Sequence, residues 1–280
     1  MNRQQKALAD TQNQADRRRV RLQRVGVKGV ELPFQIKARE NGHQTVLATV
    51  ALTADLPHYF KGTHMSRFIE ILEEWRNRPV SGSEVKMILQ QTKAILKAEM
   101  VHVDIRFKYF IEKQAPVSGL RSVLGYSSQF SGSLDGGSFD FKLGVEAPIN
   151  TVCPCSKEIA EIGAHNQRAT IRVRVRFVPG RFIWIEELVR VLERQGSAQI
   201  YPLLKREDEK YVIEQAFRNP KFVEDVVRDC VLALRADPRL RWFEVECEAE
   251  ESIHQHNAFA YDQETLVAPI GVSPRPQSNA

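Results

Sequence analysis

Two cysteines and a histidine in one short polar segment are the residues of this chain best suited to metal chemistry. Cys153 and Cys155 flank a proline, and His165 follows a few residues later. Thiolate and imidazole are the usual protein ligands of zinc and similar metals. The spacing is not that of a zinc finger and no second cysteine pair accompanies it, so a closed structural zinc site is not expected. On spacing alone, an irregular turn with two inert thiols and a capping histidine explains the segment equally well.

A His-X-His pair near the end of the chain is the second candidate. His254 and His256 lie in Glu251-Ser-Ile-His-Gln-His256, directly after a predicted strand. If that strand continued, both imidazoles would point to the same side. One could then bind a metal while the other transfers protons. A polar strand end with exposed imidazoles is the alternative, but the chain has only seven histidines, and the pairing favours a functional role.

A third polar segment, Leu203-Leu-Lys-Arg-Glu-Asp-Glu-Lys210, mixes bases and acids in a predicted loop. Its three carboxylates are possible metal ligands, although a charge run is more often a solvated surface. Together the three segments suit hydrolysis by a water molecule that a metal with an open coordination position activates.

Hydrophobic periodicity predicts the elements that must position these residues. Strands are expected at about 25–39 and 44–55 around an Asn41-Gly42 hairpin signal, and a capping box at Ser81-Gly-Ser-Glu84 opens the second of two helices. The expected order is strands 25–39 and 44–55, helices 66–75 and 81–96, strands 101–107, 120–130 and 139–145, then strand 171–177, helices 183–194 and 221–235, and strand 243–249.

This order, strands, helices, strands given twice, predicts an α+β fold with two modules. Each module is an antiparallel sheet with helices packed on one face. We expect a flexible basic arm at 1–24, module one at about 25–148, module two at about 149–270 and a tail at 271–280.

Charge predicts one strand pairing in the second module. The outward face of 171–177 carries three arginines, and the outward face of 243–249 carries three glutamates. Antiparallel neighbours would place these opposite charges across from each other, which stabilises a sheet by roughly 0.2–1 kcal/mol per pair. Two unrelated solvated faces are the alternative.

The composition restricts the class of partner. The net charge of +5 and the pI near 9.0 suit an anionic partner or a solvated basic surface, and much of the excess lies in the N-terminal arm. Because no basic stripe is interleaved with aromatic residues, a nucleic-acid-binding protein ranks low. No apolar run approaches the roughly 18 residues of a membrane span, and no signal peptide is evident. We therefore expect a cytoplasmic protein with no membrane association.

Five motifs in family order resemble the type IB GTP cyclohydrolase family, the metal-promiscuous form of GTP cyclohydrolase I, over about 25–270. They are Gly62-Thr-His-Met-Ser-Arg-Phe68, Cys153-Pro-Cys-Ser-Lys-Glu158, Gly163-Ala-His-Asn-Gln-Arg168, Asn219-Pro-Lys-Phe-Val-Glu-Asp225 and Ile253-His-Gln-His-Asn257. The resemblance implies a bimodular tunnelling fold and a homotetramer with active sites at subunit interfaces. It implies conversion of GTP and water to 7,8-dihydroneopterin triphosphate and formate, the first step of tetrahydrofolate and pterin biosynthesis.

The resemblance also implies roles for single residues. The metal ligands would be Cys153, His165, Glu207 and His254, with Asp208 or Glu209 as alternatives to Glu207. The metal would be Zn²⁺, Mn²⁺ or Fe²⁺, between which such a ligand set does not choose. Cys153 would also belong to the catalytic group, with His256 as proton shuttle and Cys155 as a neighbour of the metal.

Substrate contacts complete the prediction. Glu224 would accept two hydrogen bonds from guanine, although periodicity alone also allows a solvated helix residue. From charge and position, the candidates for the triphosphate are Lys61, Arg67, Arg168, Lys205 and Arg206. His64 precedes a helix whose N-terminus could hold an anion, although an N-cap at Ser66 is the simpler interpretation. Another tunnelling-fold enzyme acting on a pterin or purine is the main alternative function, and a structural metal protein is a third.

Overall fold

The computed structural model describes residues 12, 14–40 and 42–266. The predicted tail at 271–280 and half of the predicted arm lie outside them. The strands are β1 (Leu22–Lys37), β2 (His43–Leu56), β3 (Met100–Gln114), β4 (Arg121–Asp135), β5 (Ser138–Val152), β6 (Asn166–Phe177), β7 (Ala198–Gln199), β8 (Leu240–Ala249) and β9 (Ala258–Thr265). The helices are α1 (Met65–Trp75), α2 (Gly82–Leu96), α3 (Pro154–Ile159), α4 (Ile185–Glu193), α5 (Arg206–Arg218) and α6 (Val223–Arg235).

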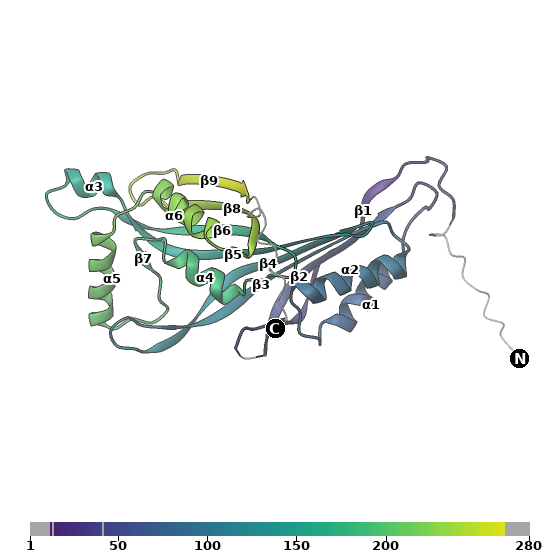
Figure 1. The fold of residues 1–280 in the computed structure, drawn as a ribbon, viewed down its shortest axis with the longest axis horizontal. Helices are drawn as coiled ribbons and strands as arrows, with labels where there is room; N and C mark the ends of the chain where they lie inside the picture. Colours follow the sequence, from purple (N-terminus) through teal and green to yellow (C-terminus); the bar gives the residue numbers. More distant parts are fainter. Residues whose placement is uncertain (1–11, 13, 41, 267–280) are drawn as a thin grey trace, which may run out of the picture. The chain divides into compact units, whose positions relative to one another are not determined.

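The strands follow the order β1-β2-β3-β4-β5-β6-β8-β9, and β7 pairs with β5 (Figure 1). Antiparallel pairs of strands accompanied by helices confirm the predicted α+β class. The structure differs from the prediction in several places, of which three concern whole segments outside the candidate site. The first strand begins at Leu22, inside the expected arm. A helix, α5, replaces most of the expected loop at 203–210, and β9 forms where no strand was expected.

The chain divides into two compact units. The first contains the described residues up to 111 together with 125–144, and the second contains 112–124 together with the described residues from 145 onward. The predicted division near 148 treats each module as continuous in sequence. The observed units are not continuous in sequence. β3 and β4 extend well beyond their predicted ends, and the turn that joins them belongs to the second unit.

In the first unit, α1 and α2 pack together, α1 against β1 and α2 against β2 (Figure 1). The alternation of β2 buries Val46, Ala48, Val50 and Leu52, and α1 adds Phe68, Ile71, Leu72 and Trp75 to the core. The predicted capping box is confirmed, since the Ser81 N–H donates to Glu84 Oε2 at 2.9 Å. Burial of the apolar side chains of β2 and α1 holds the helices on these strands.

In the second unit, α6 packs on β8 and β9, and α4 packs on α6. The predicted pairing of 171–177 with 243–249 is confirmed as the antiparallel β6–β8 ladder, in which Arg172 faces Glu246 and Arg174 faces Glu244. Arg172 Nη1 donates to Glu246 at 2.8 Å, and this hydrogen bond raises the pKa of the guanidinium. The third arginine, Arg176, faces Trp242 and stacks on its ring at 4.6 Å.

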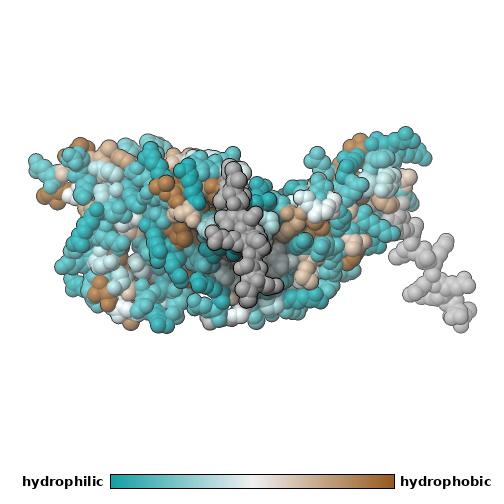
Figure 2. Space-filling model, viewed as in Figure 1, coloured by the Kyte–Doolittle hydropathy of each residue, from teal (hydrophilic) through white to brown (hydrophobic). Residues whose placement is uncertain are grey.

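The surface that Figure 2 presents is mostly hydrophilic, with scattered hydrophobic residues. Within the described residues, none of the helices has the length and apolar character that a membrane span requires.

Candidate active site

A pocket of about 290 Å³ in the second unit brings together residues from five parts of the chain. It includes Cys153, which follows β5, and Glu224, which lies in the first turn of α6. Sequence reasoning singled out both residues for separate reasons, and the fold places them on one pocket. The remaining lining residues are Thr151, Gln167, Lys221, Phe222, Val223, Glu251, Ala258 and Phe259.

Hydrogen bonds hold the backbones of two predicted metal ligands, Cys153 and His165, next to each other. The segment is not an irregular turn, which was one of the two interpretations that the spacing allowed, because Cys153 is the N-cap of the short helix α3. The Cys153 N–H donates to the carbonyl of His165 at 3.1 Å. Ser156 Oγ donates to the carbonyl of Cys153 at 3.1 Å and accepts from the His165 N–H at 3.2 Å. The thiol and imidazole positions are thus coupled through Ser156.

Two residues that the sequence analysis did not predict as site residues lie beside Nδ1 of His165. Gln167 Oε1 lies 2.9 Å from His165 Nδ1, and Glu251 Oε2 lies 3.7 Å from the same nitrogen. Gln167 is nearly buried, and Glu251 Oε2 is a buried oxygen with no hydrogen-bond partner among the described residues. A signal for Gln167 was present, because it occupies an inward position of the alternating strand β6, where an apolar residue is otherwise found.

Glu224 reaches the pocket because the start of α6 is tied to the end of β5. The Lys221 N–H donates to the carbonyl of Val152 at 3.0 Å, and its ammonium group binds Asp229 at 2.7 Å. Glu224 itself is exposed. The side chains of Phe222 and Phe259 line the same pocket, so apolar rings and a carboxylate share its wall. Such a combination suits a flat, hydrogen-bonding ligand.

The three carboxylates at the start of α5 have different surroundings. Asp208 is fully buried and accepts hydrogen bonds from the backbone N–H groups of Val117, Ser118 and Lys205 and from Ser118 Oγ, at 2.6–2.9 Å. These bonds anchor α5 to the turn between β3 and β4. Glu207 and Glu209 are exposed. Because the Asp208 oxygens are already engaged, Asp208 is the least suitable of the three as a metal ligand.

The His254–His256 pair does not continue a strand, because β8 ends at Ala249 and both histidines lie in the connection to β9. The two rings nevertheless stack, with centroids 5.1 Å apart and an interplanar angle of 16°. A bent loop, not the strand period, therefore brings them together. Both side chains are exposed.

The described residues contain no group of three or more His, Cys, Asp or Glu side chains placed to hold a metal ion. Cys153 and His165 are the pair that the structure links, while Glu207 and His254 lie outside any such group. Cys155 is exposed on α3.

The candidate triphosphate residues divide between the two units. Lys61, His64 and Arg67 lie around the start of α1 in the first unit, where His64 and not Ser66 is the N-cap. Arg168, Lys205 and Arg206 lie in the second unit, Arg168 on β6 and the other two at the start of α5. All of them are exposed except His64, which is partly buried.

Solved structures with a similar fold are uricases. The uricase of Arthrobacter globiformis aligns with a TM-score of 0.53 and 7% sequence identity, covering 90% of this chain and 96% of that structure. The urate oxidase of Bacillus subtilis 168 aligns with a TM-score of 0.50 and 9% identity, covering 86% and 98%. At such identities the likeness shows the fold alone, which is the predicted tunnelling fold.

Sequence comparisons identify closer relatives. The model of a family described as type I GTP cyclohydrolase folE2 matches residues 8–260. The protein named GTP cyclohydrolase FolE2 of Syntrophus aciditrophicus is 49% identical over 254 residues, which is 91% of this chain and 98% of the relative. The protein of the same name in Geobacter sulfurreducens is 49% identical over 253 residues, which is 90% of this chain and 96% of the relative. The predicted resemblance is therefore confirmed, and the chain belongs to the type I GTP cyclohydrolase FolE2 family.

Proposed function

We propose that this protein hydrolyses GTP to 7,8-dihydroneopterin triphosphate and formate, the first step of tetrahydrofolate biosynthesis. Membership of the family supports the reaction class. The observation that carries the proposal is the pocket in which Cys153, Glu224 and two phenylalanines meet. Cys153 would serve a metal there, and Glu224 with the phenylalanines would serve a purine base.

Glu224 would select guanine. A carboxylate can accept hydrogen bonds from the ring N–H and the exocyclic amino group of guanine at the same time, whereas adenine has no such pair of donors on that edge. Phe222 and Phe259 supply apolar surface for the base. A cavity of about 290 Å³ is near the lower limit for small-molecule pockets. It suits the base better than the whole nucleotide, so the triphosphate would extend to cationic residues outside it.

Cys153, which lines this pocket, and His165, which is bonded to its backbone, are donors that fit a divalent metal such as Zn²⁺, Mn²⁺ or Fe²⁺. Cys153 provides a thiolate, and the contact of His165 Nδ1 with Gln167 leaves Nε2 as the ligand atom. Histidines that bind metals commonly donate their other ring N–H to an amide or carboxylate oxygen in this way. Glu207 and His254 would complete the ligand set. When bound, the metal would supply an activated water at neutral pH.

The remaining roles belong to groups of the chain itself. Gln167 and Glu251 would orient His165, and Glu251 would stabilise positive charge that develops on its ring. Opening the imidazole ring of guanine requires a proton at the departing nitrogen. His256 would deliver it, since an imidazole changes protonation near neutral pH.

We further propose that the active enzyme is a homotetramer with its sites at subunit interfaces. The support is that a single described chain groups only two of the four proposed metal ligands. A second copy would then close the site. Size-exclusion chromatography with light scattering would test the oligomer, and a monomer with full activity would contradict it.

The function is tested by incubating the metal-reconstituted protein with GTP and following pterin fluorescence together with formate release. We expect both products in equal amounts. Glu207→Gln should lose activity, and Glu209→Gln, which changes the exposed carboxylate nearby on the same helix, should keep it; the opposite result would assign the ligand to Glu209. Absence of both products from metal-loaded protein that has folded would reject the proposal in favour of another pterin or purine substrate.

A further inference from the structure

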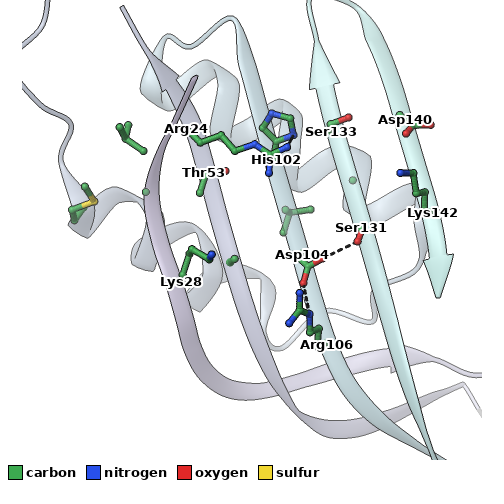
Figure 3. Close-up of a pocket in the computed structure, with 16 residues that line it drawn as sticks. Arg24, Lys28, Thr53, His102, Asp104, Arg106, Ser131, Ser133, Asp140 and Lys142 are labelled. Atoms are coloured by element: carbon green, nitrogen blue, oxygen red, sulfur yellow. Dashed lines mark hydrogen bonds and ion pairs between the residues drawn. The ribbon is translucent and has the colours of Figure 1, made fainter. Parts of the chain in front are cut away.

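A second and larger pocket, of about 700 Å³, lies in the first unit (Figure 3). All of its lining residues belong to that unit, whereas those of the candidate active site belong to the second. Its walls come from β1, β2, β3, β4 and β5 together with Met65 at the start of α1, which is the only described lining residue that belongs to a motif discussed above. None of the described residues that line it is Phe, Tyr or Trp, so it offers no platform for stacking a base.

The lining of this pocket carries more positive than negative charge. Arg24, Lys28, Arg106 and Lys142 face two carboxylates, Asp104 and Asp140. Asp104 is already engaged, because it accepts from Arg106 Nε at 2.9 Å and from Ser131 Oγ at 2.8 Å. The cations of the pocket therefore exceed its carboxylates by two, and Figure 3 shows them on both sides of His102.

His102 adds a neutral donor to the wall. Arg24 Nη2 lies 3.3 Å from His102 Nδ1, and because a guanidinium only donates, Nδ1 must accept. Burial lowers the pKa of His102 and the charge of Arg24 lowers it further, which favours the neutral ring. With Nδ1 accepting from Arg24, the neutral ring carries its proton on Nε2. That nitrogen is buried and has no hydrogen-bond partner among the described residues. An unpaired buried donor is unfavourable, and an acceptor reaching it would remove the penalty.

Gly26 fixes the strand that carries two of the cations. Its φ is +153°, and a Cβ at this position would lie 2.2 Å from the carbonyl oxygen of Leu52 on β2. Register shifts in the β1–β2 ladder lie on both sides of it. Only glycine permits this close approach, and it leaves Arg24 and Lys28 on the same pocket.

We propose that this first-unit pocket binds a small polyphosphate-bearing anion, at a site separate from the catalytic pocket. Guanidinium, ammonium and hydroxyl groups are the donors that phosphate oxygens accept from, and Thr53 and Ser133 supply hydroxyls, whereas the Ser131 hydroxyl already donates to Asp104. The volume lies within the range of small-molecule sites. Recognition here rests on the phosphates, because the pocket has cations but no aromatic ring for a base.

The test is isothermal titration of the full chain with inorganic tripolyphosphate at low salt. We expect saturable binding that Arg24→Gln/Lys28→Gln weakens at least tenfold and that added salt also weakens. The matched control is Lys108→Gln, because Lys108 is an exposed cation on β3, two residues beyond Arg106, and does not line the pocket. Circular dichroism checks that each variant folds. If the double variant does not, Lys142→Gln replaces it with the same expectation.

Two further arms decide where the anion binds and which anion it is. Lys61→Gln/Arg67→Gln removes cations near α1 that are candidates for the GTP triphosphate, and a site on Arg24 and Lys28 predicts that this variant weakens tripolyphosphate binding far less than Arg24→Gln/Lys28→Gln does. If that variant alone loses binding, or if Arg24→Gln/Lys28→Gln binds like the wild type, the assignment is overturned. Orthophosphate should bind more weakly than tripolyphosphate, and equal affinity would contradict a polyphosphate site. None of these outcomes depends on GTP turnover.

Discussion

The two pockets of this chain differ in their chemistry more than in their architecture. The second-unit pocket is lined by a thiol, two glutamates and two phenylalanines, and its lysine is neutralised by Asp229. The first-unit pocket is lined by four cations, two carboxylates, hydroxyl groups and a histidine, and none of its described lining residues is Phe, Tyr or Trp. Both are built on antiparallel strands. The difference shows that pocket function in this fold is set by which polar residues occupy the strand ends and faces.

Loss of the proposed metal ligand Cys153 should separate the two pockets most sharply. We expect Cys153→Ala to lower GTP turnover by at least about 10³-fold, since activation of water contributes several kcal/mol and each factor of ten corresponds to about 1.4 kcal/mol. Bound metal, measured by plasma mass spectrometry, should fall in parallel. Tripolyphosphate binding should be unchanged. A variant that unfolds, by circular dichroism, would instead support a structural metal site.

Changing the proposed base anchor should have the next largest effect. Glu224→Gln keeps the size of the side chain but removes one of its two acceptors, and hydrogen bonds to charged groups contribute roughly 1.5–3 kcal/mol. We expect kcat/KM for GTP to fall by roughly 10- to 100-fold, with metal content unaffected. Steady-state kinetics with GTP and ITP test this, because ITP lacks the exocyclic amino group. Unchanged discrimination between the two nucleotides would remove Glu224 from base recognition.

Substitution of Glu251 should weaken metal binding and leave recognition of the base unchanged. Because it lies beside His165 without touching the proposed ligand atom, we expect Glu251→Gln to weaken metal affinity by about 10- to 100-fold, as outer contacts of metal-binding histidines typically do. Excess metal should restore much of the activity, and the KM for GTP should stay near the wild-type value. Activity that no metal concentration restores would point to a direct catalytic role.

Much of the fold could be predicted from the sequence because its cores follow simple periods. The β6–β8 ladder was visible in alternating apolar residues and in opposite charges, and both are observed. By contrast, α5 buries only Asp208 and Ala216, so no apolar stripe marked it as a helix. β9 has no fully buried residue, and for that reason its period was not visible either.

The site was predictable only where its residues belong to motifs. Cys153, His165 and Glu224 lie in such segments, and the fold brings Cys153 and Glu224 to one pocket. Glu251 belongs to the site because the fold places it beside His165, which is distant in the sequence. Spacing along the sequence does not reveal such a contact. The pocket in the first unit was missed for a similar reason. Its cations come from three strands, each with an ordinary polar face.

Substitution of Asp208 tests whether this buried carboxylate, which follows the proposed ligand Glu207 in the sequence, has a structural role. Burial alone would raise the pKa of this carboxyl, but hydrogen bonds from Ser118 and from the backbone of Lys205 and Val117 outweigh it and lower the pKa well below the usual value. A carboxyl with a lowered folded pKa stabilises the fold above its unfolded pKa and loses that contribution as pH falls through the folded value.

Asp208→Asn should therefore lower the melting temperature at pH 7, and the gap to the wild type should narrow on acidification below about pH 4. Thermal unfolding followed by circular dichroism between pH 7 and pH 2 measures this. Activity per folded, metal-loaded molecule should change less than in Glu207→Gln, because the mutation acts through the attachment of α5 to the β3–β4 turn. A constant gap across this pH range would mean that the Asp208 charge does not contribute, and the carboxylate of Asp208 would again compete with Glu207 as a metal ligand.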